Sequence, residues 1–147
     1  FSTNFFSLND SQIIAFKSIG NRRFISSYYT DPYRWENETK KHLLFSFEQL
    51  KEIEKFLKKR NIKLDIILYP WSYELMNKNS RTNYLDYIKK INEDRNLNIH
   101  HCYDFFLKSN SLEQLEFIGQ TYLFADVHYN SKGYKILAEC VKNKLSF

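Results

Sequence analysis

The chain has 147 residues, 43% of them hydrophobic and 18% aromatic, which excludes a disordered tail because a core of ordinary size can be buried. Its net charge is +5, but the basic residues are scattered and their densest run, Lys58-Lys59-Arg60, falls where a helix should end. Because cations there complement the helix dipole, we expect no nucleic-acid partner. No stretch is long and apolar enough to span a membrane, and no signal peptide is visible.

The numbers of glycine, proline and cysteine residues limit which fold classes and which cysteine roles are expected. With three Gly and two Pro, a turn-rich β-sandwich is disfavoured and helices are favoured. The two cysteines, Cys102 and Cys140, lack metal-site spacing, and two thiols do not make a disulfide framework. We expect both to pack as small apolar side chains.

Residues 1–43 show little periodicity, and we predict an irregular, connecting region there. Within it, residues 12–19 have the spacing of a short helix, and residues 21–38 are predicted to form a long ordered loop. The pattern becomes regular at Ser46, which forms a capping box with Gln49 and predicts that a helix begins there.

The apolar run 63–69 ends at Pro70 and predicts a buried parallel strand. Residues 71–80 are predicted to be a loop, after which Thr82 or Asn83 begins another helix. This order of a strand followed by a helix is typical of a parallel sheet.

The second half of the chain continues the alternation. Residues 99–103 predict a second strand, and Ser111 with Gln114 predicts the start of a short helix. Asn130 or Ser131 is the predicted cap of the last helix. That helix is expected to bury Tyr134, Leu137, Ala138, Val141 and Leu145.

Strands alternating with helices predict an α/β fold with a parallel sheet covered on both faces. Ligands of such sheets bind beyond the carboxyl ends of the strands, where residues 71–75 should lie and residues 126–130 should lie nearby. At this edge, Trp71 and Tyr73 either line a sugar pocket or shield the core, and the sequence favours neither.

Asp126 and His128 carry the most informative pattern. Residues i and i+2 of an extended loop point to the same side, so the carboxylate can hold one ring nitrogen while the other faces a nucleophile. A serine hydroxyl attacks only when such an imidazole accepts its proton. An Asp-x-His pattern by itself is common in solvated loops. The residues around it therefore determine whether a catalytic role is expected.

The block Asp126-x-His128-x-Asn130-x-x-Gly133-Tyr134, followed by a helix that closes the chain, resembles the last block of SGNH/GDSL hydrolases. The strand 66–71, which runs into a proline, is similar to that family's central strand. The resemblance covers residues 44–147 and implies a three-layer α/β/α sandwich with a parallel sheet, of which this chain holds the C-terminal part.

The same resemblance implies that His128 is a general base and Asp126 its orienting acid, with Asn130 a candidate for substrate binding. It also implies an acylated carbohydrate as substrate, hydrolysed or used in acyl transfer, without a cofactor. The branches that it most resembles modify bacterial envelope polysaccharides, which implies a periplasmic or cell-envelope location.

The nucleophile is the main departure from the family. No G-D-S block occurs, and the weak candidates Ser7 and Ser72 lack a strained elbow. Gly20-Asn21 is the nearest match to an oxyanion donor, although a turn explains it as well. We therefore expect the first half of the domain, with its serine, to lie in an N-terminal segment outside this chain or on a partner chain.

Two further clusters of side chains stand out. His100 and His101 with Asp104 do not predict a metal site, because adjacent strand residues point to opposite faces. Aromatic and basic residues between 22 and 35 form a cluster that suits a glycan or protein interface as well as a packed loop. That cluster supports an alternative, a non-catalytic glycan- or protein-binding module of the same fold.

Overall fold

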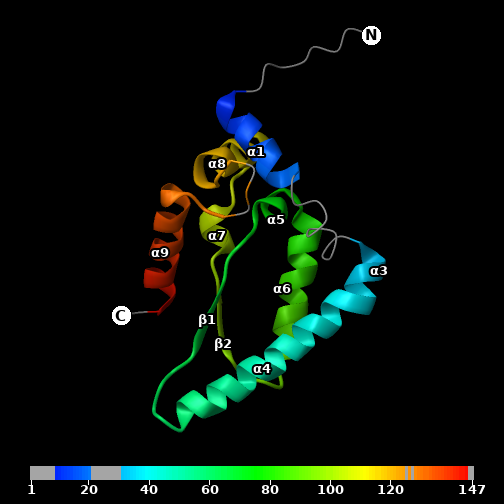
Figure 1. Ribbon diagram of the computed structural model, residues 1–147, viewed down its shortest axis with the longest axis vertical. Helices are drawn as coiled ribbons and strands as arrows, with labels where there is room; N and C mark the ends of the chain where they lie inside the picture. Colours follow the sequence, from blue (N-terminus) through cyan, green and yellow to red (C-terminus); the bar gives the residue numbers. More distant parts are fainter. Residues whose placement is uncertain (1–8, 21–30, 125, 127, 146–147) are drawn as a thin grey trace.

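The computed structural model describes residues 9–20, 31–124, 126 and 128–145 (Figure 1). In chain order its elements are α1 (Asp10–Gly20), α3 (Pro32–Arg34), the π-helical turn η1 (Trp35–Thr39), α4 (Lys40–Lys58), β1 (Asp65–Leu68), α5 (Ser72–Met76), α6 (Lys78–Asn92), β2 (Asn98–His101), α7 (Tyr103–Phe106), α8 (Ser111–Thr121) and α9 (Ser131–Leu145). The fold is thus mixed, with many helices and a small sheet, and the predicted α/β class is compatible with it.

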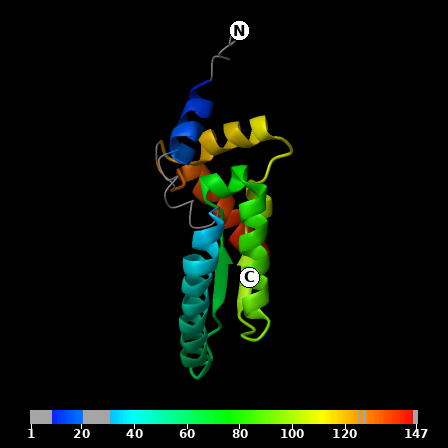
Figure 2. The ribbon, with the colours of Figure 1, turned by 90° about the vertical axis from the view of Figure 1, so that its right-hand side faces the viewer.

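The two strands pair in parallel, with Ile66 beside Ile99 and Leu68 beside His101. Helices α5 and α6 make the crossover between them, as the alternation of strand and helix predicted. Figure 1 shows α9 on one side of the strands and α6 on the other, with α4 running obliquely across the lower end of α6. Figure 2 gives the view from the side of α4 and α6.

Apolar side chains alternate between the two faces of β1. Ile66 and Leu68 pack with Ile99 of β2 against α4 and α6. The buried side chains of this cluster are Phe47 of α4, Ile88 and Ile91 of α6, and Leu97, which precedes β2. Ile67 faces a second cluster. Its buried members are Ala15, Leu75, Cys102, Phe106, Leu115, Ile118, Tyr122, Tyr129 and Cys140. Both faces of the short sheet are therefore covered.

Two glycines allow close approaches in the second cluster. A Cβ atom at Gly119 of α8 would overlap the backbone carbonyl of Ser11 in α1, and one at Gly133 of α9 would overlap the carbonyl of Thr121. Helix α1 thus rests directly on α8, and the first turn of α9 rests on the end of α8.

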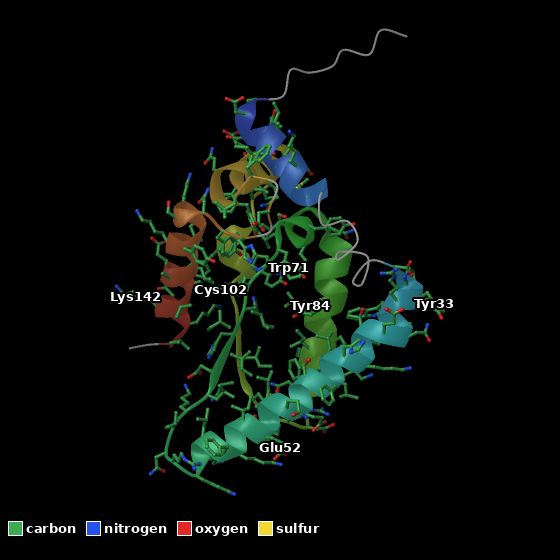
Figure 3. The ribbon with its side chains drawn as sticks, viewed as in Figure 1. Tyr33, Glu52, Trp71, Tyr84, Cys102 and Lys142 are labelled. Carbon is green, nitrogen blue, oxygen red and sulfur yellow. A yellow bond between two sulfur atoms is a disulfide. The ribbon has the colours of Figure 1, made fainter. Side chains whose placement is uncertain are left out.

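The cysteine expectation is wrong, because Cys102 and Cys140 form a disulfide with their Cα atoms 5.8 Å apart. Both residues are fully buried. Cys102 follows β2 directly and Cys140 lies on α9, so the bond ties the end of the sheet to the last helix (Figure 3). Their 38-residue separation gives no local sign of this contact, which only the packing of α9 creates.

The prediction of an irregular region over residues 1–43 is wrong for residues 32–43, which are helical. Asp31 Oδ1 accepts hydrogen bonds from the backbone N–H groups of Tyr33 and Arg34, at 2.9 and 3.2 Å, and Pro32 occupies the first helical position. Helix α4 therefore begins before Ser46, whose hydroxyl donates to the His42 carbonyl (2.9 Å) inside the helix instead of capping it.

Other boundaries also shift. Residues 71–80, predicted to be a loop, contain α5 and the start of α6. The cap of α8 is Asn110, while Gln114 is buried and donates to the Phe106 carbonyl at 3.0 Å. In α9, Tyr134 and Ala138 are exposed instead of buried. The helix within residues 12–19 and both strands are confirmed, each with small shifts at its ends.

Candidate functional site

Asp126 and His128 lie on a short loop between α8 and α9 whose base is closed by hydrogen bonds. Tyr122 and Tyr129 form an isolated antiparallel bridge at this base. Within it, the backbone N–H of Leu123 donates to the carbonyl of His128 at 2.9 Å. The loop therefore has a hairpin-like base that fixes where its tip projects.

The structure brings the two candidate side chains together. Asp126 Oδ1 lies 2.7 Å from His128 Nδ1 and also accepts the backbone N–H of His128 at 3.3 Å. The His128 side chain is 65% exposed and that of Asp126 37% exposed. This arrangement pairs Nδ1 with the carboxylate and places Nε2 on the opposite side of the ring.

Both ends of the loop are fastened to the carboxyl end of β1. The hydroxyls of Tyr122 and Tyr129 each donate to the carbonyl oxygen of Pro70, both at 2.8 Å. Burial raises the pKa of both hydroxyls, so they remain protonated donors over the whole physiological range. The loop thus lies at the sheet edge where parallel sheets bind ligands, as the sequence predicted.

Aromatic rings surround the base of the loop. The Tyr129 ring stacks on Phe106 with centroids 4.9 Å apart, and the rings of Tyr69 and Tyr134 each lie 5.7 Å from it. Tyr69 and Tyr134 are about half exposed. The residue that follows His128 is therefore at the centre of an aromatic cluster with two rings at the surface.

A cavity of about 180 Å³ opens beside the same strand end. Trp71, the N-cap residue of α5, and Tyr84 of α6 both line this cavity, and both are labelled in Figure 3. The remaining lining residues are Ile67, Leu68, Tyr69, Glu74 and Tyr103. Of the two residues predicted for a sugar pocket, Trp71 is thus in a cavity wall. Tyr73 lies outside this lining, and its hydroxyl accepts a hydrogen bond from Asn77 at 3.2 Å.

Asn130 caps the N-terminal end of α9. Its Oδ1 accepts the N–H groups of Lys132 (2.9 Å) and Gly133 (3.1 Å), as predicted for the start of the last helix. Its Nδ2 donates to the Gln120 carbonyl at 2.9 Å. Asn130 therefore joins the loop to α8 and α9, and its role in substrate binding stays a prediction.

The structure leaves the nucleophile unassigned. Ser72, the first residue of α5, is 1% exposed, and Ser7 lies outside the described residues. Gly20 is the last residue of α1, and Asn21 also lies outside the described residues. Over the described part of the chain, no hydrogen bond joins His128 to a serine hydroxyl.

A second histidine–carboxylate pair joins the two strands. His100 Nε2 lies 2.9 Å from Asp65 Oδ1, and Lys63 Nζ lies 3.1 Å from the same oxygen. The hydrogen bond from His100 is the main cause of the lowered pKa of the Asp65 carboxyl. Within the described ranges, no group of three metal-ligating side chains is found, and no helix is long and apolar enough to cross a membrane.

Sequence reasoning missed three residues that position the site. Tyr122 and Tyr129 supply the bonds to Pro70, and Glu74 places a buried carboxylate in the cavity wall. The sequence gives no clear signal for either tyrosine, because aromatic and apolar residues are frequent throughout residues 122–129. Glu74 lies in residues 71–80, which were predicted to be a loop, and no hydrophobic periodicity in that segment indicated that its side chain is buried.

Comparisons with protein families, with curated proteins and with solved structures find no match to this chain. The SGNH/GDSL resemblance therefore depends on the residues of the Asp126–His128 block, and membership of that family is a proposal.

Proposed function

We propose that this chain is the C-terminal part of an SGNH-type serine ester hydrolase or O-acyltransferase that acts on an acylated carbohydrate. The observation that carries the proposal is the 2.7 Å contact between Asp126 Oδ1 and His128 Nδ1. Its place on a loop anchored at Pro70 supports the proposal, because that edge of a parallel sheet is the usual ligand site. Helices on both sides of the strands are compatible with a three-layer α/β/α sandwich.

In the proposed reaction, Asp126 accepts the Nδ1–H of His128, and Nε2 takes the proton of a serine hydroxyl as its oxygen attacks the acyl carbonyl. Collapse of the tetrahedral intermediate breaks the ester bond, and the imidazolium returns its proton to the departing sugar oxygen. Water or a second sugar hydroxyl then attacks the acyl-enzyme, which regenerates the serine. We propose that the serine and the oxyanion donors belong to a further N-terminal segment or a partner chain.

Two features support the carbohydrate and the compartment. The rings of Tyr69 and Trp71 lie at the strand end beside the loop, and flat aromatic faces suit the apolar faces of sugar rings. The disulfide between Cys102 and Cys140 suits an oxidising compartment such as the bacterial periplasm or cell surface. Both fit an enzyme that modifies envelope polysaccharides.

A second candidate is a non-catalytic glycan- or protein-binding module. The burial of Ser72 favours it, because a hydroxyl that solvent does not reach is a poor nucleophile, while Tyr69 and Tyr134 remain exposed for binding. This alternative predicts that His128→Ala leaves binding intact, whereas removal of the Tyr69 ring weakens it.

Labelling with a serine-reactive fluorophosphonate, read by intact mass, separates the two candidates. We expect an adduct on the chain assembled with its upstream segment or partner, and its loss in His128→Ala. His42→Ala is the matched control, because His42 is an exposed histidine on α4. The enzyme proposal fails if the assembled protein gives no adduct, or if labelling is the same with and without His128.

A further inference from the structure

The C-terminal end of α4 and the turn after it carry most of the excess positive charge of the chain. Residues 51–63 hold six lysine or arginine residues and two glutamates, a net charge of +4, whereas the whole chain has a net charge of +5. Three lysines of this segment pair with nearby carboxylates, namely Lys51, Lys55 and Lys63. Over the part of the chain that the structure describes, no carboxylate forms an ion pair with the three exposed cations at the helix end, Lys58, Lys59 and Arg60.

Large apolar side chains are exposed among these cations. Ile53 is 47% exposed, Phe56 is 56% exposed and Ile62 is 50% exposed. The guanidinium carbon of Arg60 lies 3.7 Å from the centroid of the Phe56 ring, so a cation covers one part of the ring. An open depression of about 620 Å³ lies beside the ring, and its lining residues are Glu52, Lys55, Phe56, Lys58 and Lys59. Cations and apolar groups therefore form one mixed surface.

The backbone fixes where this surface points. Asn61 has a φ of 58° and closes the helix, because the N–H groups of Asn61 and Ile62 donate to the carbonyls of Lys58 (3.0 Å) and Leu57 (3.1 Å). Figures 1 and 2 both show this end of α4 at the opposite end of the molecule from α8. The mixed surface thus lies at a projecting end of the fold, where it can meet a flat partner.

The combination of charges and apolar groups indicates the kind of partner. Lysines at a helix C-terminus complement the helix dipole, but the dipole does not account for the exposed apolar side chains beside them. A soluble polyanion would neutralise the lysines and would offer the Phe56 ring no apolar phase to enter. An anionic bilayer offers both, because basic side chains bind its surface charge and apolar side chains enter the boundary between head groups and acyl chains.

We propose that this end of the molecule docks on the surface of a membrane that contains anionic phospholipids. We call the docking surface the basic tip, and its residues are Ile53, Phe56, Lys58, Lys59, Arg60 and Ile62. The cations hold the tip to the head groups, and the three apolar side chains enter the boundary region. The docking is peripheral, and it does not depend on the proposed function, because no residue of the tip belongs to the Asp126–His128 loop.

Flotation with lipid vesicles tests the inference. We would mix the chain, with its disulfide formed, with vesicles of equal parts phosphatidylglycerol and phosphatidylcholine, and separately with vesicles of phosphatidylcholine alone. Each basic side chain near an anionic surface strengthens binding about fivefold, so the three cations of the tip should favour the anionic vesicles about a hundredfold. The preference should weaken as salt is added, because the interaction is screened.

The charge of the tip is tested by Lys58→Gln/Lys59→Gln, which should weaken partition into anionic vesicles by roughly twentyfold. The matched control is Lys135→Gln/Lys142→Gln, which removes the same charge from exposed positions of α9 and should change partition by less than about twofold. Circular dichroism would establish that each variant is folded, as expected for changes at exposed positions.

The apolar part of the tip is tested by Phe56→Ala, which should weaken partition into anionic vesicles about tenfold, because the ring no longer leaves water on binding. Leu112→Ala is its matched control, since Leu112 is an exposed apolar side chain on α8, at the other end of the molecule. This control should partition as the wild-type chain does.

Absence of partition into anionic vesicles, equal partition into both kinds of vesicle, or an equal loss in the α9 double variant would each overturn the inference. Unchanged partition of Phe56→Ala would also overturn it, and binding of soluble polyphosphate would then identify a polyanion as the partner of the lysines. The fluorophosphonate experiment uses no lipid and is read separately. Labelling that depends on His128 without vesicle binding removes this inference alone, and the reverse pair of results removes the esterase proposal alone.

Discussion

Removal of the disulfide should cost this protein a large part of its stability. The bond closes a loop of 38 positions between Cys102 and Cys140. In the chain-entropy treatment of cross-links, closing a loop of this length lowers the entropy of the unfolded chain and so raises its free energy by about 4 kcal/mol at 25 °C. For a chain of this size, that loss corresponds to a fall in melting temperature of roughly 10 °C.

The assay is thermal and urea unfolding, followed by circular dichroism, of the oxidised chain, the reduced chain and the variant Cys102→Ala/Cys140→Ala. Reduced and oxidised wild-type chains should differ by about 4 kcal/mol in free energy of unfolding. The reductant should not affect the double variant, which controls for its other effects. A difference below about 1 kcal/mol between the two wild-type forms would refute the reasoning, because it would mean that the bond restricts the unfolded chain little.

Three further perturbations test the packing and the electrostatics. Tyr129→Phe should lower the free energy of unfolding by about 1 kcal/mol, since it removes one buried hydrogen bond, and unchanged urea midpoints would contradict this. Gly119→Ala should cost about 1–3 kcal/mol, because its Cβ would overlap the Ser11 carbonyl, and full protease resistance of α1 in that variant would speak against it. The lowered pKa of Asp65, due first to its hydrogen bond with His100, means that its stabilising effect is complete above roughly pH 4 and disappears as the pH falls through the lower folded-state pKa. Urea midpoints of Asp65→Asn and wild type should therefore converge in strong acid, and a constant gap would exclude this linkage.

Local patterns predicted those elements whose own residues carry a clear pattern of apolar and turn-forming side chains. The run at residues 63–69 is short, apolar and followed by proline, and it forms β1. The prediction for residues 32–43 missed a helix although Asp31 followed by Pro32 is a local sign of a helix start. Long-range contacts also help to stabilise this helix. The ring of Trp35 packs edge-on against Tyr87 of α6 with centroids 5.6 Å apart, and no spacing within residues 31–43 signals a partner so far along the chain.

The candidate site also has one part that the sequence predicts and one part that it does not. The contact between Asp126 and His128 joins residues two positions apart, so the sequence alone could predict it. The bonds from Tyr122 and Tyr129 to Pro70 span 52 and 59 positions, and nothing in the sequence indicated them. The fit between sequence and structure is therefore good for the pair itself and poor for what fixes its position.

These long-range bonds determine where the Asp126–His128 pair is held on the fold. On one side, the loop is held to the end of β1 through Pro70. On the other, it runs into α9, whose Cys140 is bonded to Cys102 at the end of β2. Because both supports lie at the carboxyl edge of the sheet, they hold the Asp126–His128 pair at the edge where parallel sheets usually bind ligands.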